Sequence, residues 1–255
     1  PPKALEVLID DTAEILCVTD IKKILHVYYK EGKGSDPIIH FYETFLSEYD
    51  PTLREKRGVY YTPEPVVRYI VKSIHSILKS HFSLKDGLAD SAVTLLDPAA
   101  GTLTFPAEAI KLAVHEYTGK YGSGSIKQMI KHHIIPHFYA LELMMAPYTV
   151  GHLKISYLLD ELVYQMAEDE RFKLYLSNTL EKDLPAQIET PFTHEITEEC
   201  LLANKVKQDE PVLVILGNPP YSVNSENTNE WTEQLLKQDL DGATSYYKVD
   251  GMPLG

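Results

Sequence analysis

The sequence predicts an α/β protein whose core is a mostly parallel sheet with helices on both faces. Two observations support this fold class. From Ala92 onward, short apolar segments alternate with longer segments whose apolar residues recur at helical spacing. The short segments are apolar at nearly every position, which is typical of parallel strands buried on both faces. We therefore expect the order β-α-β-α-β-α-β in this part of the chain.

The expected strands and helices are short and well separated. The strands are AVTLL (92–96), HFYALEL (137–143), FKLYLS (172–177) and PVLVILG (211–217). Helical spacing predicts helices at 105–117, 126–134, 146–165 and 193–206. In sheets of this kind, ligands bind outside the carboxyl ends of the strands. The residues that follow each strand are therefore candidates for a functional site.

A helical segment is expected before the sheet. Residues 1–57 should form an N-terminal helical segment, and residues 58–255 the α/β domain. The chain begins with Pro1 rather than methionine and ends at Gly255, soon after a loop rich in polar residues. We therefore expect the sequence to be a piece of a longer protein.

A further helix is expected at 60–78, entered through Thr62-Pro63, because proline suits the first turn of a helix. Its apolar residues recur every three or four positions, so one face should be buried. That face is expected to consist of Val66, Ile70, Ile74, Ile77 and Leu78.

The composition excludes several classes of protein. No apolar run is long enough to span a membrane and no signal-peptide pattern is present, so we expect a cytoplasmic protein. The net charge of −13 argues against a surface that is basic throughout, but it allows a local basic groove or a partner domain that supplies one. Cys17 and Cys200 match no redox or metal spacing and are expected to be reduced core thiols. His132, His133 and His137 share no regular spacing with acidic or cysteine ligands, so no metal site is expected.

The first three strands end in residues that suit a ligand. In LLDPAAGTLTF, Asp97-Pro98 turns the chain and the small residues 99–101 let the backbone approach a ligand before a helix begins. Glu142 ends the second strand, where an acidic residue binds ribose hydroxyls in nucleotide-binding folds. Asn178-Thr179, after the third strand, carry polar groups that suit a purine edge. An ordinary turn or loop cap is the alternative interpretation of each of these clusters.

The strongest signal is GNPPY (217–221), after the fourth strand. The Asn218 amide oxygen is one acceptor, and the prolines fix the backbone so that the Pro219 carbonyl is a second acceptor with a defined direction. Tyr221 offers a flat face for stacking. Two converging acceptors and an aromatic face suit a planar base with an exocyclic amine, extruded from a duplex. A turn without such a role is the alternative.

With these motifs, the chain resembles the S-adenosylmethionine-dependent DNA adenine-N6 methyltransferases of the gamma group, in which the cofactor motifs precede the catalytic one. GNPPY contains the catalytic N-P-P-[YF] motif, and DPAAGTLTF (97–105) resembles the motif D-P-A-x-G-[ST]-G-x-F. GVYYTPEPVV (58–67) resembles the group's motif near the cofactor methionine. The resemblance covers roughly 41–255, and residues 41–67 and 247–255 are most similar to large single-chain restriction–modification enzymes.

The resemblance implies a Rossmann-like class I methyltransferase core and assigns roles within it. The implied catalytic residues are Asn218, Pro219, Pro220 and Tyr221. The implied contacts of S-adenosyl-L-methionine are Tyr61, Thr62 and Pro63 near its methionine, Asp97, Pro98, Ala99, Gly101, Thr102 and Phe105 in the motif after the first strand, Glu142 at the ribose with Leu143 next to it in the sequence, and Asn178, Thr179 and Leu180 at the adenine.

The resemblance also implies the reaction and its partners. A methyl group would pass directly from S-adenosylmethionine to the N6 amine of a flipped adenine, without a metal. Double-stranded DNA would be held through a target-recognition domain that this sequence lacks, and nuclease and helicase parts are expected in the same polypeptide.

One position departs from the family pattern. Leu103 stands where the family has its second glycine, and its side chain would either crowd the cofactor or point away from it. Two alternatives to a DNA methyltransferase stay open. One is an N-P-P-Y methyltransferase that acts on a protein glutamine or an RNA guanine. The other is a non-catalytic cofactor-binding or scaffold module with a degenerate site at Leu103.

Overall fold

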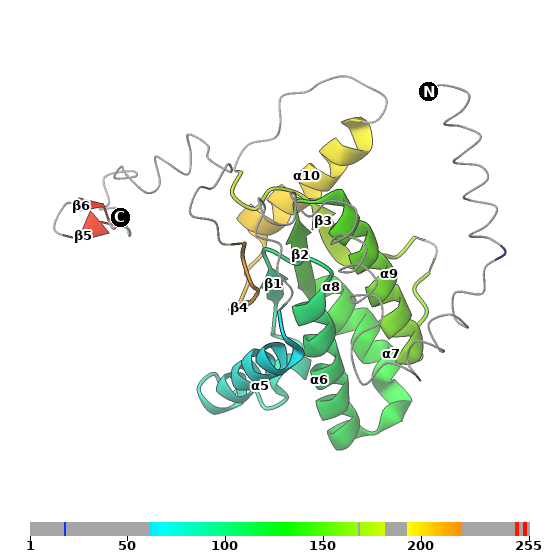
Figure 1. The fold of residues 1–255 in the computed structure, drawn as a ribbon. Coiled ribbons are helices and arrows are strands. Elements are labelled where there is room, and N and C mark those ends of the chain that lie inside the picture. The colour runs from blue at the N-terminus through cyan, green and yellow to red at the C-terminus, as the bar shows by residue number, and fades with distance from the viewer. Residues whose placement is uncertain are drawn as a thin grey trace. The chain divides into compact units, whose positions relative to one another are not determined.

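The structure is a computed structural model that describes residues 62–167, 169–181 and 193–220, together with Val18, 248–249 and 252–253 (Figure 1). The chain divides into two compact units, Pro1–Pro51 and Thr52–Gly255. All described residues except Val18, which is helical, belong to the second unit. The other residues of the expected N-terminal segment lie outside the described ranges.

The core of the second unit is a parallel sheet of four strands, in the order β3-β2-β1-β4. This confirms the predicted fold class, with helices on both faces of the sheet (Figure 1). A separate antiparallel pair joins β5 (Lys248–Val249) to β6 (Met252–Pro253). The strands of the parallel sheet are β1 (Leu95–Asp97), β2 (Phe138–Glu142), β3 (Lys173–Leu176) and β4 (Val214–Ile215).

Strand β4 is shorter than the apolar run 211–217 predicted, and Thr94 gives the reason. The Thr94 hydroxyl donates to the Pro211 carbonyl at 2.6 Å and accepts from the Leu213 N–H at 2.8 Å. A side chain therefore takes the place of backbone ladder bonds at the entrance to β4. Regular pairing with β1 begins only at Val214.

The helices follow the predicted order, with two differences. The helix that starts at Ile126 contains a π turn, where Pro136, which has no backbone N–H, interrupts the regular hydrogen bonds. The helix after β1 continues to Tyr121, into the predicted loop. The elements are α5 (Glu64–Ser80), η1 (Gly87–Ala89), α6 (Thr104–Tyr121), η2 (Ser123–Ser125), α7 (Ile126–Met129), η3 (Ile130–Ile134), α8 (Ile135–His137), α9 (Met145–Glu161) and α10 (Thr193–Asp209).

Successive strand residues face two different hydrophobic clusters. Leu95 belongs to the larger cluster, which includes residues of α5, α6 and α9, whereas Leu96 belongs to a smaller cluster that includes Ala203 and Val206 of α10. Both faces of the sheet are therefore apolar, which explains why the strands lack alternating polar residues. Each large side chain that is fully buried in this way contributes about 1.5–3 kcal/mol.

The predicted buried face of α5 is confirmed for Leu78, which is buried, and for Ile70 and Ile74, which pack against the core, but it is shifted at Val66 and Ile77. Val66 and Ile77 are each 46% exposed, while the neighbouring Val67 and Val71 are fully buried. The burial of His75 explains the shift, because a polar ring that finds hydrogen-bond partners can occupy a core position that an apolar pattern does not reveal. The buried residues of α5 are Val67, Val71, His75 and Leu78.

Two histidines hold the turn η1 through the backbone of Leu88. The Leu88 N–H donates to His75 Nδ1 at 3.2 Å, and His133 Nε2 of η3 lies 2.9 Å from the Leu88 carbonyl oxygen. Burial lowers the pKa of both histidines, so both rings are neutral near pH 7. Gly87 has a φ of +56°, and a Cβ at this position would lie 2.5 Å from the His75 ring. The turn therefore requires glycine for both space and backbone conformation.

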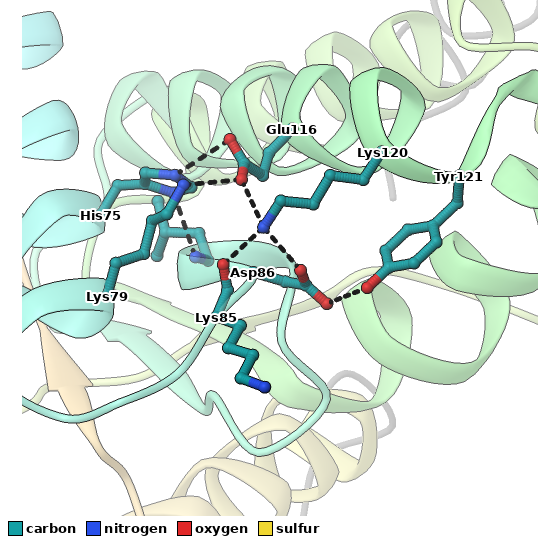
Figure 2. Close-up of polar contacts among 8 residues, drawn as sticks. His75, Lys79, Lys85, Asp86, Glu116, Lys120 and Tyr121 are labelled. Atoms are coloured by element: carbon teal, nitrogen blue, oxygen red, sulfur yellow. Dashed lines mark hydrogen bonds and ion pairs between the residues drawn. The ribbon is translucent and has the colours of Figure 1, made fainter.

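A network of ion pairs surrounds the His75 ring and joins α5 to α6 (Figure 2). Glu116 lies 2.7 Å from Lys79 Nζ and 2.9 Å from Lys120 Nζ, and these two lysines lower its pKa to about 2. Lys120 also bonds Asp86, which accepts from the Tyr121 hydroxyl. The exposed pairs contribute little singly, but the network fixes the C-terminal half of α5 to α6 and to the loop before η1.

We predict that His75 makes folding stability depend on pH. Its pKa is lower in the folded state, so the unfolded state binds more protons as the pH falls below about 6.5. The stabilisation is present above that pH and is lost below it. His75→Leu removes the acceptor for the Leu88 N–H and should cost about 1–3 kcal/mol at neutral pH.

Urea unfolding measures this effect as the stability gap between wild type and His75→Leu, which should shrink between pH values of about 7.5 and 5.5. Ser76→Ala, at an exposed position of the same helix, is the control and should give a gap that does not change with pH, because neither side chain titrates. A gap for His75→Leu that is equal or larger at the lower pH would contradict the prediction.

Candidate active site at the carboxyl edge of the sheet

The strand order places the candidate residues at a topological switch point. From β1 the chain passes to β2 and then β3 on one side, and it crosses back to β4 on the other side of β1. Ligands of open α/β sheets bind at this point, outside the carboxyl ends of the strands. The residues that follow the strands line up along this edge as 178–180 after β3, 142–143 after β2, 97–102 after β1 and 218–220 after β4.

The ends of β1 and β4 lie unusually close together at Asp97 and Gly217. A Cβ added at Gly217 would be 2.5 Å from the Asp97 Oδ1 atom, too close for any side chain. Glycine is therefore required before Asn218 so that the loop after β4 can pass beside the Asp97 carboxyl group. This contact brings the DPAAG and NPPY motifs together.

The Asp97 carboxyl group is fully buried and only partly satisfied. Oδ1 accepts from the Ala99 N–H at 3.1 Å, whereas Oδ2 has no hydrogen-bond partner among the described residues. Burial raises the pKa of Asp97 to about 7, and the nearby Glu142 carboxylate contributes to the rise. A buried carboxyl without a partner is costly, and a bound cation or hydrogen-bond donor would relieve that cost.

Glu142, at the end of β2, is held by backbone donors. Oε2 accepts from the Gly101 N–H at 2.7 Å and Oε1 from the Met144 N–H at 2.8 Å. Burial raises the pKa of Glu142, while these N–H groups oppose the shift. A carboxylate has about four lone-pair sites, so each oxygen retains acceptor capacity for a ligand hydroxyl.

The loop after β1 reaches Glu142 through two backbone bonds. The Ala100 N–H donates to the Leu141 carbonyl at 2.9 Å, next to the bond from Gly101 to Glu142. Gly101 has a φ of +53°, and nothing lies within 4 Å of where its Cβ would be. The backbone there is open on one side, as a close approach by a ligand requires. Phe105 is buried in the core, while Pro98, Ala99 and Thr102 are partly exposed.

Leu103 has a left-handed backbone with a φ of +61°, the conformation that glycine adopts most readily. Its side chain is fully buried, and its Cγ would lie 3.2 Å from a Cβ at Gly151 of α9. Leu103 therefore belongs to the hydrophobic core between α6 and α9. The space that Gly151 leaves is the space that the leucine fills.

The loop after β3 is tied to its surroundings by side chains. The Thr179 hydroxyl donates to the Pro98 carbonyl at 2.5 Å, which links this loop to the DPAAG loop. The Asn178 amide accepts from the Leu180 N–H and donates to Glu181, so it shapes its own loop. Leu180 and Leu143 are 42% and 49% exposed and present apolar surface at this edge.

Lys207 of α10 is a residue of this loop that sequence reasoning missed. Its ammonium group donates to Asn178 O at 2.7 Å, Glu181 O at 3.1 Å and Ser177 Oγ at 3.2 Å. Burial lowers its pKa, and the half-buried cation is surrounded by the carbonyl dipoles of the loop. A lysine near the end of a polar helix carries no sequence signal for such a role.

Asn218 lies half-buried after β4 and is joined to the entry of α5. Its Nδ2 atom donates to the Thr62 Oγ1 atom at 3.0 Å, although the two residues are 156 positions apart. Pro219 and Pro220 follow it and are exposed. Tyr61 and Tyr221, two other predicted site residues, lie outside the described ranges.

Two of the three clustered histidines, His132 and His133, bond to neighbouring protein groups. Within the ranges that the structure describes, no group of three or more His, Cys, Asp or Glu residues could hold a metal ion. His133 instead bonds the Leu88 carbonyl, and His132 bonds Gln128.

None of the helices described is long and apolar enough to cross a membrane.

Three solved structures, two of them of type ISP restriction–modification enzymes, resemble the chain. The DrdV–DNA complex, solved by cryo-electron microscopy, is 29% identical with a TM-score of 0.54 over 75% of this chain. The type ISP enzyme LlaGI, bound to a DNA substrate mimic, is 26% identical with a TM-score of 0.56 over 76%. The type ISP enzyme LlaBIII bound to DNA is 23% identical with a TM-score of 0.59 over 92%, which supports the fold.

The chain spans only 16–17% of the length of each of these proteins. No curated protein matches it. The family model for N-6 DNA methylase matches residues 33–244, which include all four strands of the parallel sheet and the NPPY motif. The resemblance seen in the motifs is thereby confirmed, and the chain belongs to the N-6 DNA methylase family.

Proposed function

We propose that this chain is the methyltransferase part of a restriction–modification enzyme, which transfers a methyl group from S-adenosylmethionine to the N6 amine of an adenine flipped out of DNA. The observation that carries the proposal is the contact between Asp97 and Gly217, which brings a buried carboxyl group beside the NPPY motif at the switch point of the sheet. The family match and the DNA complexes of the similar enzymes support it.

The residues along the sheet edge fit S-adenosylmethionine. Asp97 has a buried oxygen without a partner among the described residues, which suits the positive charge of this cofactor. Glu142 keeps lone pairs for the ribose hydroxyls, and the open side of Gly101 leaves room next to the backbone. We assign the adenine side to Asn178, Thr179 and Leu180, with Leu143 beside them, and the methionine side to Tyr61, Thr62 and Pro63. Pro98, Ala99 and Thr102 of the loop after β1, and Phe105 in the first turn of α6, complete the site.

The bound cofactor supplies an activated methyl group on its sulfonium. The work of the protein is then to hold and polarise the target amine. Asn218 Oδ1 and the Pro219 carbonyl accept hydrogen bonds from the amine, which raises the electron density on its nitrogen. Tyr221 stacks on the base and holds it after it leaves the duplex.

The acidic charge of the chain fits an enzyme in which another part of the protein binds most of the DNA. A net charge of −13 gives little attraction to DNA phosphates. We therefore assign most of the DNA grip, and the choice of target sequence, to a target-recognition domain beyond this chain. Among the alternatives raised by the motif, adenine in DNA is favoured over a protein glutamine or an RNA guanine, because the family is that of DNA methylases.

We predict that, in the full-length enzyme, Asn218→Ala abolishes methyl transfer while leaving S-adenosylmethionine affinity within about threefold of wild type. The loss should reach about a hundredfold or more, since an electrostatic contact to the reacting group is removed. The measurement is incorporation of labelled methyl groups into DNA, RNA and protein acceptors. Methylation of DNA by the variant at the wild-type rate, or of RNA or protein alone by wild type, would sink the proposal.

The Asp97 carboxyl should couple cofactor affinity to pH. With a pKa of about 7, Asp97 is partly protonated at neutral pH, and a cationic ligand favours its ionised form. Binding should therefore release part of a proton, and affinity should rise by up to about tenfold between pH 6 and pH 8. Calorimetry in two buffers of different ionisation enthalpy measures the proton release. The Asp97→Asn variant should bind S-adenosylmethionine more weakly and without releasing a proton. Equal affinity of the wild type at both pH values would contradict the role of Asp97 in binding the cofactor.

The loop after β3 should depend on Lys207. Lys207→Met removes the three hydrogen bonds that hold residues 177–181, so the adenine side of the cofactor site should loosen. We expect a dissociation constant for S-adenosylmethionine that is about tenfold higher. Lys205→Met, an exposed lysine on the same helix, is the matched control and should change affinity less than about twofold. Equal effects of the two substitutions would contradict the assignment.

A further inference from the structure

We propose that Thr62 is a positioning residue, whose hydroxyl oxygen fixes the orientation of the Asn218 amide. This role is additional to the place of Thr62 on the methionine side of the cofactor, and the inference deepens the proposed function and rests on it. The observation that carries it is the hydrogen bond of 3.0 Å from Asn218 Nδ2 to Thr62 Oγ1.

The orientation of the amide decides what Asn218 can do. An asparagine side chain offers a carbonyl oxygen that accepts and an NH₂ group that donates. An incoming amine is polarised only if it meets the oxygen, and a rotated amide would present a second donor to it. Because Nδ2 is engaged by Thr62, the Oδ1 atom is the end that remains for the amine. The amide is thereby set before the target base arrives.

Thr62 can hold this position because the helix behind it is anchored. It precedes Pro63 and the first turn of α5, where the Val66 and Val67 N–H groups both donate to the Pro63 carbonyl. The opposite half of α5 is fixed through His75 and Lys79, which both contact Glu116 of α6 (Figure 2). About 13 residues of helix, roughly 20 Å, separate Thr62 from this anchor. The hydroxyl therefore stands at the end of a stiff element.

On the Asn218 side, the backbone is equally confined. The Leu216 N–H donates to the Leu96 carbonyl at 3.1 Å, and Gly217 packs against the Asp97 carboxyl. The two prolines that follow restrict the chain on the other side. With its backbone fixed at both ends, the remaining freedom of Asn218 is rotation of its side chain, and the bond to Thr62 is the contact that limits it.

The test compares Thr62→Val, which replaces the hydroxyl by a methyl group of similar size, with Thr62→Ser, which keeps the hydroxyl. NMR of the Asn218 side-chain NH₂ protons in the full chain reports the bond directly, without cofactor or DNA. We expect slow solvent exchange of these protons in wild type and Thr62→Ser, and exchange at least about tenfold faster in Thr62→Val. Thr62→Ala is a second variant without the hydroxyl and should behave like Thr62→Val.

Kinetics then separate positioning from cofactor binding. In the full-length enzyme saturated with S-adenosylmethionine, Thr62→Val should lower the single-turnover rate of DNA methylation by about tenfold to thirtyfold, a loss that persists after any change in the dissociation constant of the cofactor is accounted for. Thr62→Ser should recover at least about a third of the wild-type rate. In an Asn218→Ala background, Thr62→Val should have no further effect on any residual rate.

The outcomes are distinguishable from a failure of the proposed function. If the wild-type full-length enzyme does not methylate DNA, or its Asn218→Ala variant is fully active, the proposed function fails, and this inference fails with it. If Asn218→Ala is inactive but Thr62→Val retains the wild-type rate or unchanged NH₂ exchange, only the role of Thr62 is overturned. A loss in Thr62→Val that lies entirely in cofactor affinity would return Thr62 to the cofactor alone and would also overturn the inference.

Discussion

The candidate site depends on the close passage of two chain segments, the end of β1 and the turn after β4. Only a glycine at position 217 lets the second segment lie against the Asp97 carboxyl. Parallel pairing of β1 with β4 fixes their relative register, so the approach is a property of the sheet rather than of flexible loops. The other site residues lie on either side of this contact. Glu142 lies on one side, where it accepts a hydrogen bond from the Gly101 N–H, and Asn218 lies on the other.

Much of this arrangement could be predicted from the sequence. Fully apolar strands imply a sheet covered on both faces, and their order along the chain implies parallel pairing, so the strand ends had to meet at one edge. The residues predicted there lie along that edge, as the positions of Asp97, Glu142 and Asn218 illustrate. Short motifs are enough to predict these positions because the end of a strand is a local feature of the sequence. Pairing of the strands in the sheet then brings the distant motifs together.

What could not be predicted involves single long-range pairs. Lys207 has ordinary sequence surroundings, and the motif around Thr62 predicts a contact with the cofactor rather than with Asn218. The partners of both residues are known only once the fold is formed. The shifted face of α5 has a related cause, since His75 is buried by a hydrogen bond from Leu88 that no hydropathy pattern contains. A buried polar group needs a hydrogen-bond partner, and here that partner lies on another segment of the chain. The sequence pattern of one segment therefore does not reveal the pair.

Leu103 changes what the second glycine of the motif should be taken to mean. A left-handed backbone costs a leucine about 1–2 kcal/mol, which burial of the side chain against Gly151 can offset. In this chain Gly151 of α9 leaves the space that the Leu103 side chain occupies, and the Leu103 backbone keeps the left-handed conformation. A motif pattern specifies a glycine at this position. The fold requires only a left-handed backbone conformation and enough space for the side chain that is present. Relatives that keep the leucine would be expected to keep a small residue at position 151.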